Sequence, residues 1–298
     1  MKIKSWIEAA RLRTLPLSVS GIIVGCGMAF ADNSFNGLLL ALLLATTILL
    51  QVLGNFANDL GDFQHGTDND NRVGPKRTLQ GGGLTVGEMK RGIVIMIVLS
   101  LAVGITMLCV SFGISIGFWI FVAIGLAAIV AAIRYTMGSN PFGYRGLGDL
   151  MVLIFFGFAT VTGSYFIMTH HVTIDSILMG AAIGFMSVGV LNVNNLRDCE
   201  SDRVSGKVTI VVKLGIRFGQ IYHFVLCLSA IVLIAVTLVI EKRAVGMLWL
   251  LLPTILLIMH SLRVLRASDV KTLDPELKKL SLTTLLMSVL YLVAIIWR

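Results

Sequence analysis

Long apolar stretches separated by short polar segments run along almost the whole chain. A bilayer core about 30 Å thick requires about 20 mostly apolar residues for each spanning helix. Dividing the chain at its polar segments gives nine stretches of that size and predicts an all-α integral membrane protein. The expected spans are Pro16–Ala31, Gly37–Ala57, Gly92–Phe112, Ser115–Met137, Leu147–Thr169, Ile174–Val193, Gly219–Ile240, Val245–Leu265 and Leu280–Trp297.

The overall composition agrees with this pattern. Of the 298 residues, 56% are hydrophobic and 13% are charged, and the mean hydropathy is +0.91. Because soluble domains carry about 25% charged residues, a water-soluble enzyme is excluded. The four cysteines show no C-x-x-C spacing, so neither a disulfide framework nor a thiolate metal site is indicated.

The basic residues lie mainly on one side of the predicted membrane. With the N-terminus inside, all of the 24 Lys and Arg residues except Lys242, Arg243 and Arg298 fall in the inner segments. This asymmetry follows the positive-inside rule, and it predicts a multi-pass protein of the cytoplasmic (cell inner) membrane with its N-terminus in the cytosol. The same rule accounts for the net charge of +8, so nucleic-acid binding is not expected.

The N-terminal leader combines a basic start with an apolar stretch and the small-residue triplet Ala29-Phe30-Ala31, as a signal peptide does. We expect no cleavage, and we expect the leader to lie in the membrane interface as an amphipathic helix. Its polar side would carry Lys2, Lys4, Arg11 and Arg13, and its apolar side Ile3, Trp6 and Ile7.

Two sets of acidic and amide side chains follow the second and sixth spans at helical spacing. The first set is Asn55, Asn58, Asp59 and Asp62, and the second is Asn195, Asp198 and Asp202. Asn195, Asp198 and Asp202 each lie 140 positions after a member of the first set. We therefore expect one membrane domain over residues 1–298, with a possible repeat of four-helix units at about 16–137 and 147–265 followed by a ninth helix.

The residue types in these sets indicate a bound metal and an anion. Carboxylates and amides on facing helices suit Mg²⁺, which binds a few carboxylates and completes its shell with water and phosphate oxygens. The loops that follow supply bases that bind phosphate: Arg72, Lys76 and Arg77 after the first set, and Arg203 and Lys207 after the second. A single aspartate at a membrane edge is more simply a solvated charge, but two sets at matched spacing favour a Mg²⁺-bound diphosphate.

The segments Asn55–Asp68 and Asn195–Asp202 resemble the two aspartate-rich motifs of the UbiA-type membrane prenyltransferases. The resemblance implies nine helices around a lipid-open central cavity, with Asp59, Asp62, Asp198 and Asp202 as the catalytic acids. The implied Mg²⁺ ligands are Asn58, Asp59, Asp62, Asp68, Asp198 and Asp202. The implied substrate-binding residues are Asn55, Arg72, Lys76, Arg77, Arg134, Tyr135, Asn195 and Lys207.

Further segments are most similar to the branch of this superfamily that prenylates 1,4-dihydroxy-2-naphthoate in menaquinone biosynthesis. They are Gly66-Thr67-Asp68, Arg72–Arg77, Arg134-Tyr135-Thr136 and Gly146–Asp149. Many superfamily members carry a third aspartate where this chain has Gly66, and the next acid is Asp68. Whether Asp68 or His65 touches the metal is therefore left open.

The resemblance implies Mg²⁺-dependent transfer of a polyprenyl group from its diphosphate to 1,4-dihydroxy-2-naphthoate, with loss of CO₂, to give demethylmenaquinol. Tyr135 would orient or stabilise the allylic cation, and Arg13 or Arg134 would bind the acceptor carboxylate. One alternative is another aromatic acceptor such as 4-hydroxybenzoate. A second is an ion-coupled transporter, which is expected to carry charges near mid-span. No obligate protein partner is indicated.

Overall fold

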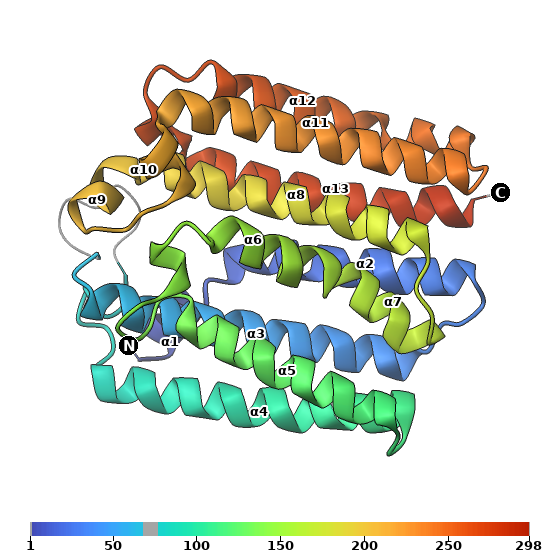
Figure 1. Ribbon diagram of the computed structural model, residues 1–298, viewed down its shortest axis with the longest axis horizontal. Coiled ribbons are helices and arrows are strands. Elements are labelled where there is room, and N and C mark those ends of the chain that lie inside the picture. Colours follow the sequence, from blue (N-terminus) through green and yellow to red (C-terminus); the bar gives the residue numbers. More distant parts are fainter. Residues whose placement is uncertain (1, 68–76, 298) are drawn as a thin grey trace.

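The computed structural model describes residues 2–67 and 77–297, and the side chain of Arg13 is not described. Asp68, Arg72 and Lys76 therefore lie outside the described residues. Within the described ranges the chain is helical, and its one β-bridge joins Arg145 to Val208. Figure 1 shows the long helices running side by side along the longest axis of the molecule.

The nine predicted spans are confirmed as helical segments. Eight are long and apolar enough to cross a membrane, and the ninth, α2, forms a bent pair with α1. Most of the spans are single helices: α2 (Leu15–Ala31), α3 (Gly37–Gln64), α4 (Val86–Phe112), α5 (Ile116–Arg134), α8 (Ile174–Arg197) and α11 (Ile216–Ile240). The others are composite: α6 (Gly148–Val152) with η3 (Leu153–Phe158) and α7 (Val161–Thr169), η4 (Ala244–Leu250) with α12 (Leu251–Leu265), and η5 (Val270–Leu273) with α13 (Asp274–Ile296).

Several helices extend past the predicted apolar stretches. The helix α3 begins at the N-cap Asn36, whose side chain accepts hydrogen bonds from Leu38 and Leu39, and continues to Gln64. The first acidic set therefore lies on about the last three turns of a membrane-spanning helix rather than in a loop. We call the end of the bundle that carries Asp62 and Asp198 the motif end.

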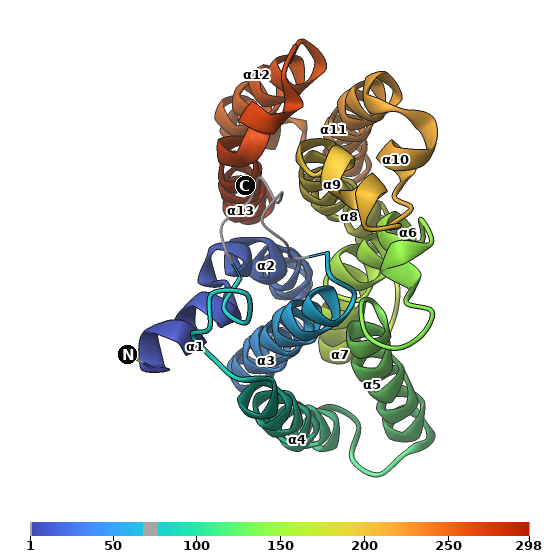
Figure 2. The same cartoon turned by 90° about the vertical axis from the view of Figure 1, so that its left-hand side faces the viewer.

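The spans surround a central space when the bundle is viewed along its length. Figure 2 shows α2 and α3 between α4 and α5 on one side and α8, α11, α12 and α13 on the other. The last span, α13, packs along α2, and α8 packs against both α11 and η3. The chain thereby brings its first and last spans into contact and encloses a central space.

Glycines allow close contacts between some of these helices. A Cβ atom on Gly25 would lie 2.3 Å from the carbonyl oxygen of Val161, and one on Gly157 would lie 2.8 Å from the Cα atom of Gly184. Both distances are shorter than van der Waals contact. These glycines therefore act in helix packing.

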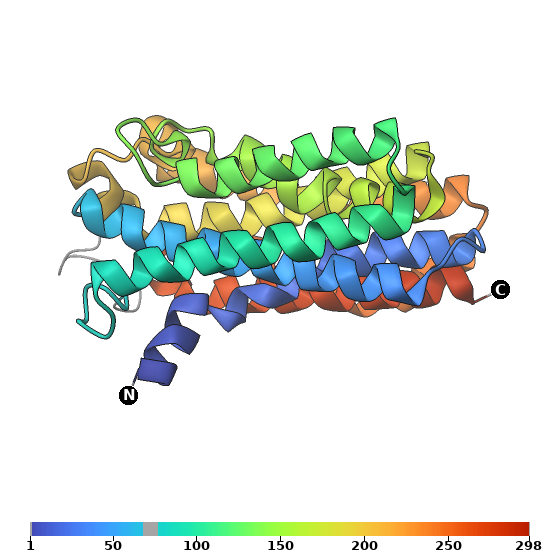
Figure 3. The same cartoon turned by 90° about the horizontal axis from the view of Figure 1, so that it is seen from below.

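The leader forms α1 (Lys2–Ala10), which points away from the bundle in Figure 3. Trp6 packs on Phe56 of α3 with the ring centroids 5.2 Å apart, whereas Ile3 and Ile7 are exposed. This arrangement is typical of a helix that lies in the membrane interface. Arg11 departs from the prediction, because its side chain turns inward instead of joining the polar side of the leader.

Candidate functional site

A cavity of about 1100 Å³ occupies the centre of the bundle. Asp62 at the motif end and Leu43 farther along α3 both line it. A helical rise of about 1.5 Å per residue places these two positions about 28 Å apart. Charged side chains gather at the motif end, and the rest of the wall is mainly apolar, with Met107, Phe121 and Phe166 toward the other end.

The first acidic set divides between the cavity and a buried ion pair. Asn58 and Asp62, one turn apart on α3, line the cavity. Asp59 points elsewhere and is 1% exposed. Its carboxylate is paired with the guanidinium of Arg11, and Arg77 Nε lies 3.7 Å away. Asp59 therefore holds two arginines that themselves line the cavity.

Asp62 is oriented by a phenol from the loop that follows α5. The hydroxyl of Tyr144, in the short helix η2 (Phe142–Tyr144), donates a hydrogen bond of 2.9 Å to Asp62 Oδ1. The same hydroxyl is bonded to the Thr67 side chain. Lys207 Nζ lies 5.7 Å from the centre of the Tyr144 ring, which is a cation–π distance.

The second acidic set begins where α8 ends. Asp198 is the C-cap residue of α8, and its two oxygens accept hydrogen bonds of 2.8 and 2.6 Å from Nε and Nη2 of Arg197. Arg197 is almost fully buried and also pairs with Asp274 at the start of α13. This bidentate contact fixes the plane of the Asp198 carboxylate and connects α8 to α13.

Asp202 lies on α9 (Cys199–Val204), and it is 2% exposed. Its Oδ1 is 3.6 Å from Lys207 Nζ, whereas its buried Oδ2 has no hydrogen-bond partner among the residues that the structure describes. Burial raises the pKa of Asp202 to about 6; Lys207 opposes the rise, and the charges of Asp198 and Asp62 add to it. The three carboxylates thus repel one another, and a bound cation would relieve that repulsion.

Lys207 is brought to the site by a tight turn. Gly206 has φ +74°, and the Lys207 amide donates to the Asp202 carbonyl at 2.9 Å. Burial by itself would lower the pKa of Lys207, but Asp202, Asp62 and Asp198 outweigh it and raise this pKa. The side chain therefore stays cationic beside the carboxylates.

The oxygen donors at the motif end fit Mg²⁺ shared with a phosphate. In residues 2–67 and 77–297, no three His, Cys, Asp or Glu side chains converge as a ready-made metal cage. Asp62, Asp198 and Asp202 nevertheless line one end of one cavity, and Asp202 keeps an unpaired oxygen. Mg²⁺ commonly binds one or two carboxylates together with waters and substrate phosphates, and this arrangement suits that mode.

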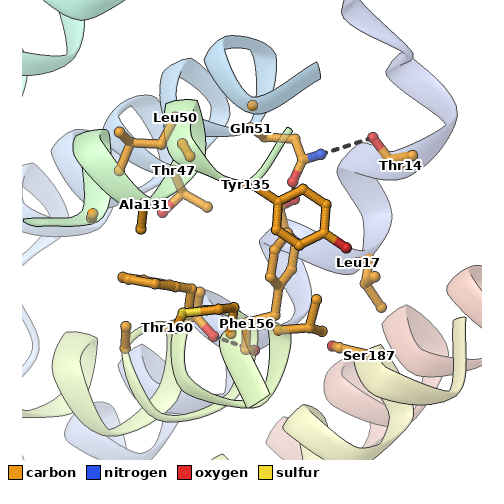
Figure 4. Close-up of a pocket in the computed structure, with 18 of the residues that line it drawn as sticks. Thr14, Leu17, Thr47, Leu50, Gln51, Ala131, Tyr135, Phe156, Thr160 and Ser187 are labelled. Carbon is orange, nitrogen blue, oxygen red and sulfur yellow. Dashed lines mark hydrogen bonds between the residues drawn. The ribbon is translucent and has the colours of Figure 1, made fainter. Parts of the chain in front are cut away.

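Some of the other predicted site residues line the cavity, and others lie outside it. Tyr135 and Asn55 line the cavity, and Figure 4 shows the Tyr135 ring projecting into it. Arg134 is exposed at the end of α5, and it is not one of the cavity-lining residues. His65 is also outside the lining and is bonded to the Gly138 carbonyl at 3.1 Å.

Asn195 is buried but does not line the cavity, whereas its neighbour Asn194 does. The predicted spacing of Asn195, Asp198 and Asp202 assumes one continuous helix. The backbone leaves the helical conformation at Asp198, with φ −94° and ψ 7°, before α9 begins. The second acidic set therefore does not lie along one face of a single helix, contrary to the prediction from its spacing.

Some site residues were not identified from the sequence. Arg11 was assigned to the surface of the leader, Arg197 was counted only as an inner charge, and Tyr144 follows no periodic pattern. Each contacts an acid of the first or second set. Asp274 and Lys278 of α13 also line the motif end of the cavity.

Residues 18–294 match the UbiA prenyltransferase family. A Haemophilus influenzae protein named 1,4-dihydroxy-2-naphthoate octaprenyltransferase is 39% identical over 97% of this chain and 95% of its own length. An Escherichia coli protein of the same name is 38% identical over 99% of this chain and 96% of its own length.

Solved structures share the fold. A UbiA homolog from Aeropyrum pernix superposes with a TM-score of 0.70 at 16% identity, covering 96% of this chain and 98% of that chain. A UbiA homolog from Archaeoglobus fulgidus, bound to DMAPP and Mg²⁺, gives a TM-score of 0.66 at 16% identity over 99% of this chain and all of that chain (100%). The ion-coupled transporter alternative is not supported. With its cavity, its paired acidic sets and these matches, the chain belongs to the UbiA prenyltransferase family.

Proposed function

We propose that the protein transfers a polyprenyl group from polyprenyl diphosphate to 1,4-dihydroxy-2-naphthoate, with decarboxylation. The observation that carries the proposal is the cavity, which joins a charged end to a long apolar channel. A diphosphate ester with a polyprenyl tail has the same two parts. The acceptor is taken from the two bacterial relatives, whose names specify the naphthoate.

The diphosphate would lie at the motif end, between the two acidic sets. Arg77 and Lys207 line that end and would bind phosphate oxygens. Arg72 and Lys76, outside the described residues, are proposed to join them, and a metal role for Asp68 stays a prediction. Asn58, Asp62, Asp198 and Asp202 would hold Mg²⁺, which when bound would offset the charge of the leaving diphosphate.

The reaction needs no covalent nucleophile from the protein. As the allylic C–O bond breaks, the diphosphate departs with the electron pair, and the basic side chains stabilise its charge. The Tyr135 ring faces the cavity, where it would stabilise the carbocation. The ring carbon bearing the carboxylate then attacks the cation, and loss of CO₂ returns the electron pair that restores aromaticity.

The proposed location is the cytoplasmic membrane, with the motif end facing the cytosol. The charge asymmetry of the loops supports this orientation. Both substrates would then enter without crossing the membrane, because the donor tail can remain among apolar side chains while its diphosphate stays at the charged end.

The test is a prenyl-transfer assay with purified protein, polyprenyl diphosphate and Mg²⁺. One reaction contains carboxyl-labelled 1,4-dihydroxy-2-naphthoate, and a parallel reaction contains 4-hydroxybenzoate. We expect labelled CO₂ and a prenylated naphthoquinol only in the first. Product only from 4-hydroxybenzoate would overturn the proposed acceptor while leaving the prenyltransferase assignment intact.

A further inference from the structure

Four hydroxyl and amide side chains connect α2 to α3 inside the cavity. They are Thr14, Ser18, Gln51 and Asn55, and all four line the cavity wall. Ser18 Oγ donates to Gln51 Oε1 at 2.6 Å, and Gln51 Nε2 donates to Thr14 Oγ1 at 3.2 Å and to Asn55 Oδ1 at 3.3 Å. We call these four residues the amide–hydroxyl cluster. Figure 4 shows Gln51 and Thr14 beside the cavity into which Tyr135 projects.

All of the N–H and O–H donors in this cluster are used within the protein. Both N–H groups of Gln51 and the hydroxyl of Ser18 are engaged as described above. The Thr14 hydroxyl donates to the Arg11 carbonyl at 2.9 Å. Asn55 Nδ2 donates to the Ala10 carbonyl at 2.9 Å and to Thr14 Oγ1 at 3.4 Å. What remains for a ligand is acceptor capacity: a second lone pair on each of Gln51 Oε1 and Asn55 Oδ1, and the lone pairs of Ser18 Oγ.

We propose that the amide–hydroxyl cluster binds an aromatic hydroxyl group of the acceptor, which donates its hydrogen bond to Gln51 Oε1. This inference rests on the proposed function and adds the orientation of the acceptor within the cavity. A phenolic hydroxyl is a donor and matches the remaining acceptors, whereas a carboxylate offers only acceptors and does not.

The carboxylate of the acceptor has a separate binding partner nearer the motif end. Arg11 lines the cavity and pairs with Asp59, which lies two turns beyond Gln51 on α3. Two turns correspond to about 12 Å along the helix. The carboxylate therefore points to Arg11, and the hydroxyl farthest from it points to Gln51. This orientation directs the carboxylate-bearing carbon toward the end where the diphosphate leaves.

The ring itself would lie among apolar and aromatic side chains. Tyr135 and Phe156 both line the cavity, and Figure 4 shows their rings within it. The cluster thus contributes to acceptor recognition and to the direction of attack.

The experiment compares the binding of two ligands under reducing conditions: 1,4-dihydroxy-2-naphthoate and 1-hydroxy-2-naphthoate, which lacks the hydroxyl assigned to Gln51. Their Kd values are measured with the wild-type protein, Gln51→Leu and Ser18→Ala. We expect the wild-type protein to prefer the dihydroxy compound about tenfold, as one buried hydrogen bond implies. In Gln51→Leu the preference should fall to about onefold, and in Ser18→Ala it should fall to about threefold.

Ser20→Ala is the matched control. Ser20 lies two residues from Ser18 on α2, its hydroxyl donates to the Pro16 carbonyl in its own helix at 2.7 Å, and it does not line the cavity. This variant should keep the tenfold preference, and Gln51→Leu should keep the wild-type KM for polyprenyl diphosphate. An unchanged preference in folded Gln51→Leu and Ser18→Ala would overturn the inference alone. Failure of the wild-type protein to bind or prenylate the dihydroxy compound would overturn the proposed function as well.

Discussion

Asp202 differs from the other acids of the site because one of its buried oxygens has no partner. Its Oδ1 is near Lys207, and its Oδ2 accepts no hydrogen bond. Leaving a buried acceptor unsatisfied costs about 1–3 kcal/mol. A bound ligand that contacts this oxygen would offset that cost. We infer that this ligand is Mg²⁺, which Asp202 would bind together with Asp62 and Asp198.

Replacing this carboxylate by an amide tests the inference. We expect Asp202→Asn to lower kcat by at least about 100-fold, because the oxygen that binds Mg²⁺ would lose its charge. The measurement is prenyl transfer at saturating Mg²⁺, with thermal unfolding in detergent as a check on folding. Glu200→Gln on the same short helix is the control, since Glu200 is exposed and paired with Lys271; near-wild-type rates in Asp202→Asn would refute the metal assignment.

The phenol of Tyr144 gives a second prediction at this scale. Tyr144→Phe removes the hydroxyl that orients Asp62, and a hydrogen bond to a charged group is worth about 1.5–3 kcal/mol. We therefore expect kcat/KM to fall by about tenfold or more, with the half-saturating Mg²⁺ concentration raised.

Tyr165→Phe is the comparison for this variant. Tyr165 donates a similar bond of 2.6 Å to Asp32, the C-cap residue of α2, but it does not line the cavity. Its loss should lower the unfolding temperature without changing kcat/KM by more than about twofold. Equal effects of the two variants on activity would mean that Tyr144 acts only through stability.

At the scale of helices, close packing and buried ion pairs hold the site in place. Arg197 joins Asp198 of the second acidic set to Asp274 of α13, so the position of the last span is coupled to an acid of the site. On the other side of the cavity, α2 lies against α7, because Gly25 leaves room for the backbone at Val161. Packing in lipid depends on such small residues, since apolar burial alone does not drive helices together there.

A methyl group at this contact should separate the two helices. In Gly25→Ala the new Cβ would lie 2.1 Å from Ser164 Oγ as well as 2.3 Å from the Val161 carbonyl oxygen. We expect a loss of about 1–3 kcal/mol in stability, measured as a lower unfolding temperature in detergent. Gly87→Ala is the matched control, because nothing lies within 4 Å of its Cβ position in α4; it should leave stability unchanged or slightly higher. An equal loss in both variants would contradict the packing argument.

At the scale of the whole molecule, the basic residues and the charged part of the cavity lie at the same end of the bundle. The bases are concentrated at the motif end, together with the charged part of the cavity, while the apolar channel continues toward the opposite end. The first and last spans meet where α13 packs along α2. The site therefore faces one side of the membrane only, and we propose that this side is the cytosol.

Labelling of single cysteines measures this orientation. Val204→Cys at the motif end and Lys242→Cys at the opposite end place thiols at exposed positions. In intact bacterial spheroplasts a membrane-impermeant maleimide should label Lys242→Cys, and in inverted vesicles it should label Val204→Cys. The wild-type protein is the control, since three of its four cysteines are buried and Cys109 lies within α4. The reverse pattern would mean that the topology is inverted.

How much of the site the sequence predicts depends on whether its residues share one helix. Asn58 and Asp62 lie one turn apart on a continuous helix, and both face the cavity as their spacing predicts. Asn195, Asp198 and Asp202 do not share one face in this way, because α8 ends at Asp198 and Asp202 lies on a separate helix, α9. Helical spacing specifies a face only as far as the helix continues.

The sequence alone determined the number of spans, the side on which the bases collect and the two acidic sets, because each depends on the order of polar and apolar residues along the chain. The tertiary structure decided which side chains meet. Arg11 reaches Asp59, and Tyr144 reaches Asp62, across large separations in sequence. Such pairs depend on which helices become neighbours and on how the loops turn back, and local periodicity carries neither kind of information.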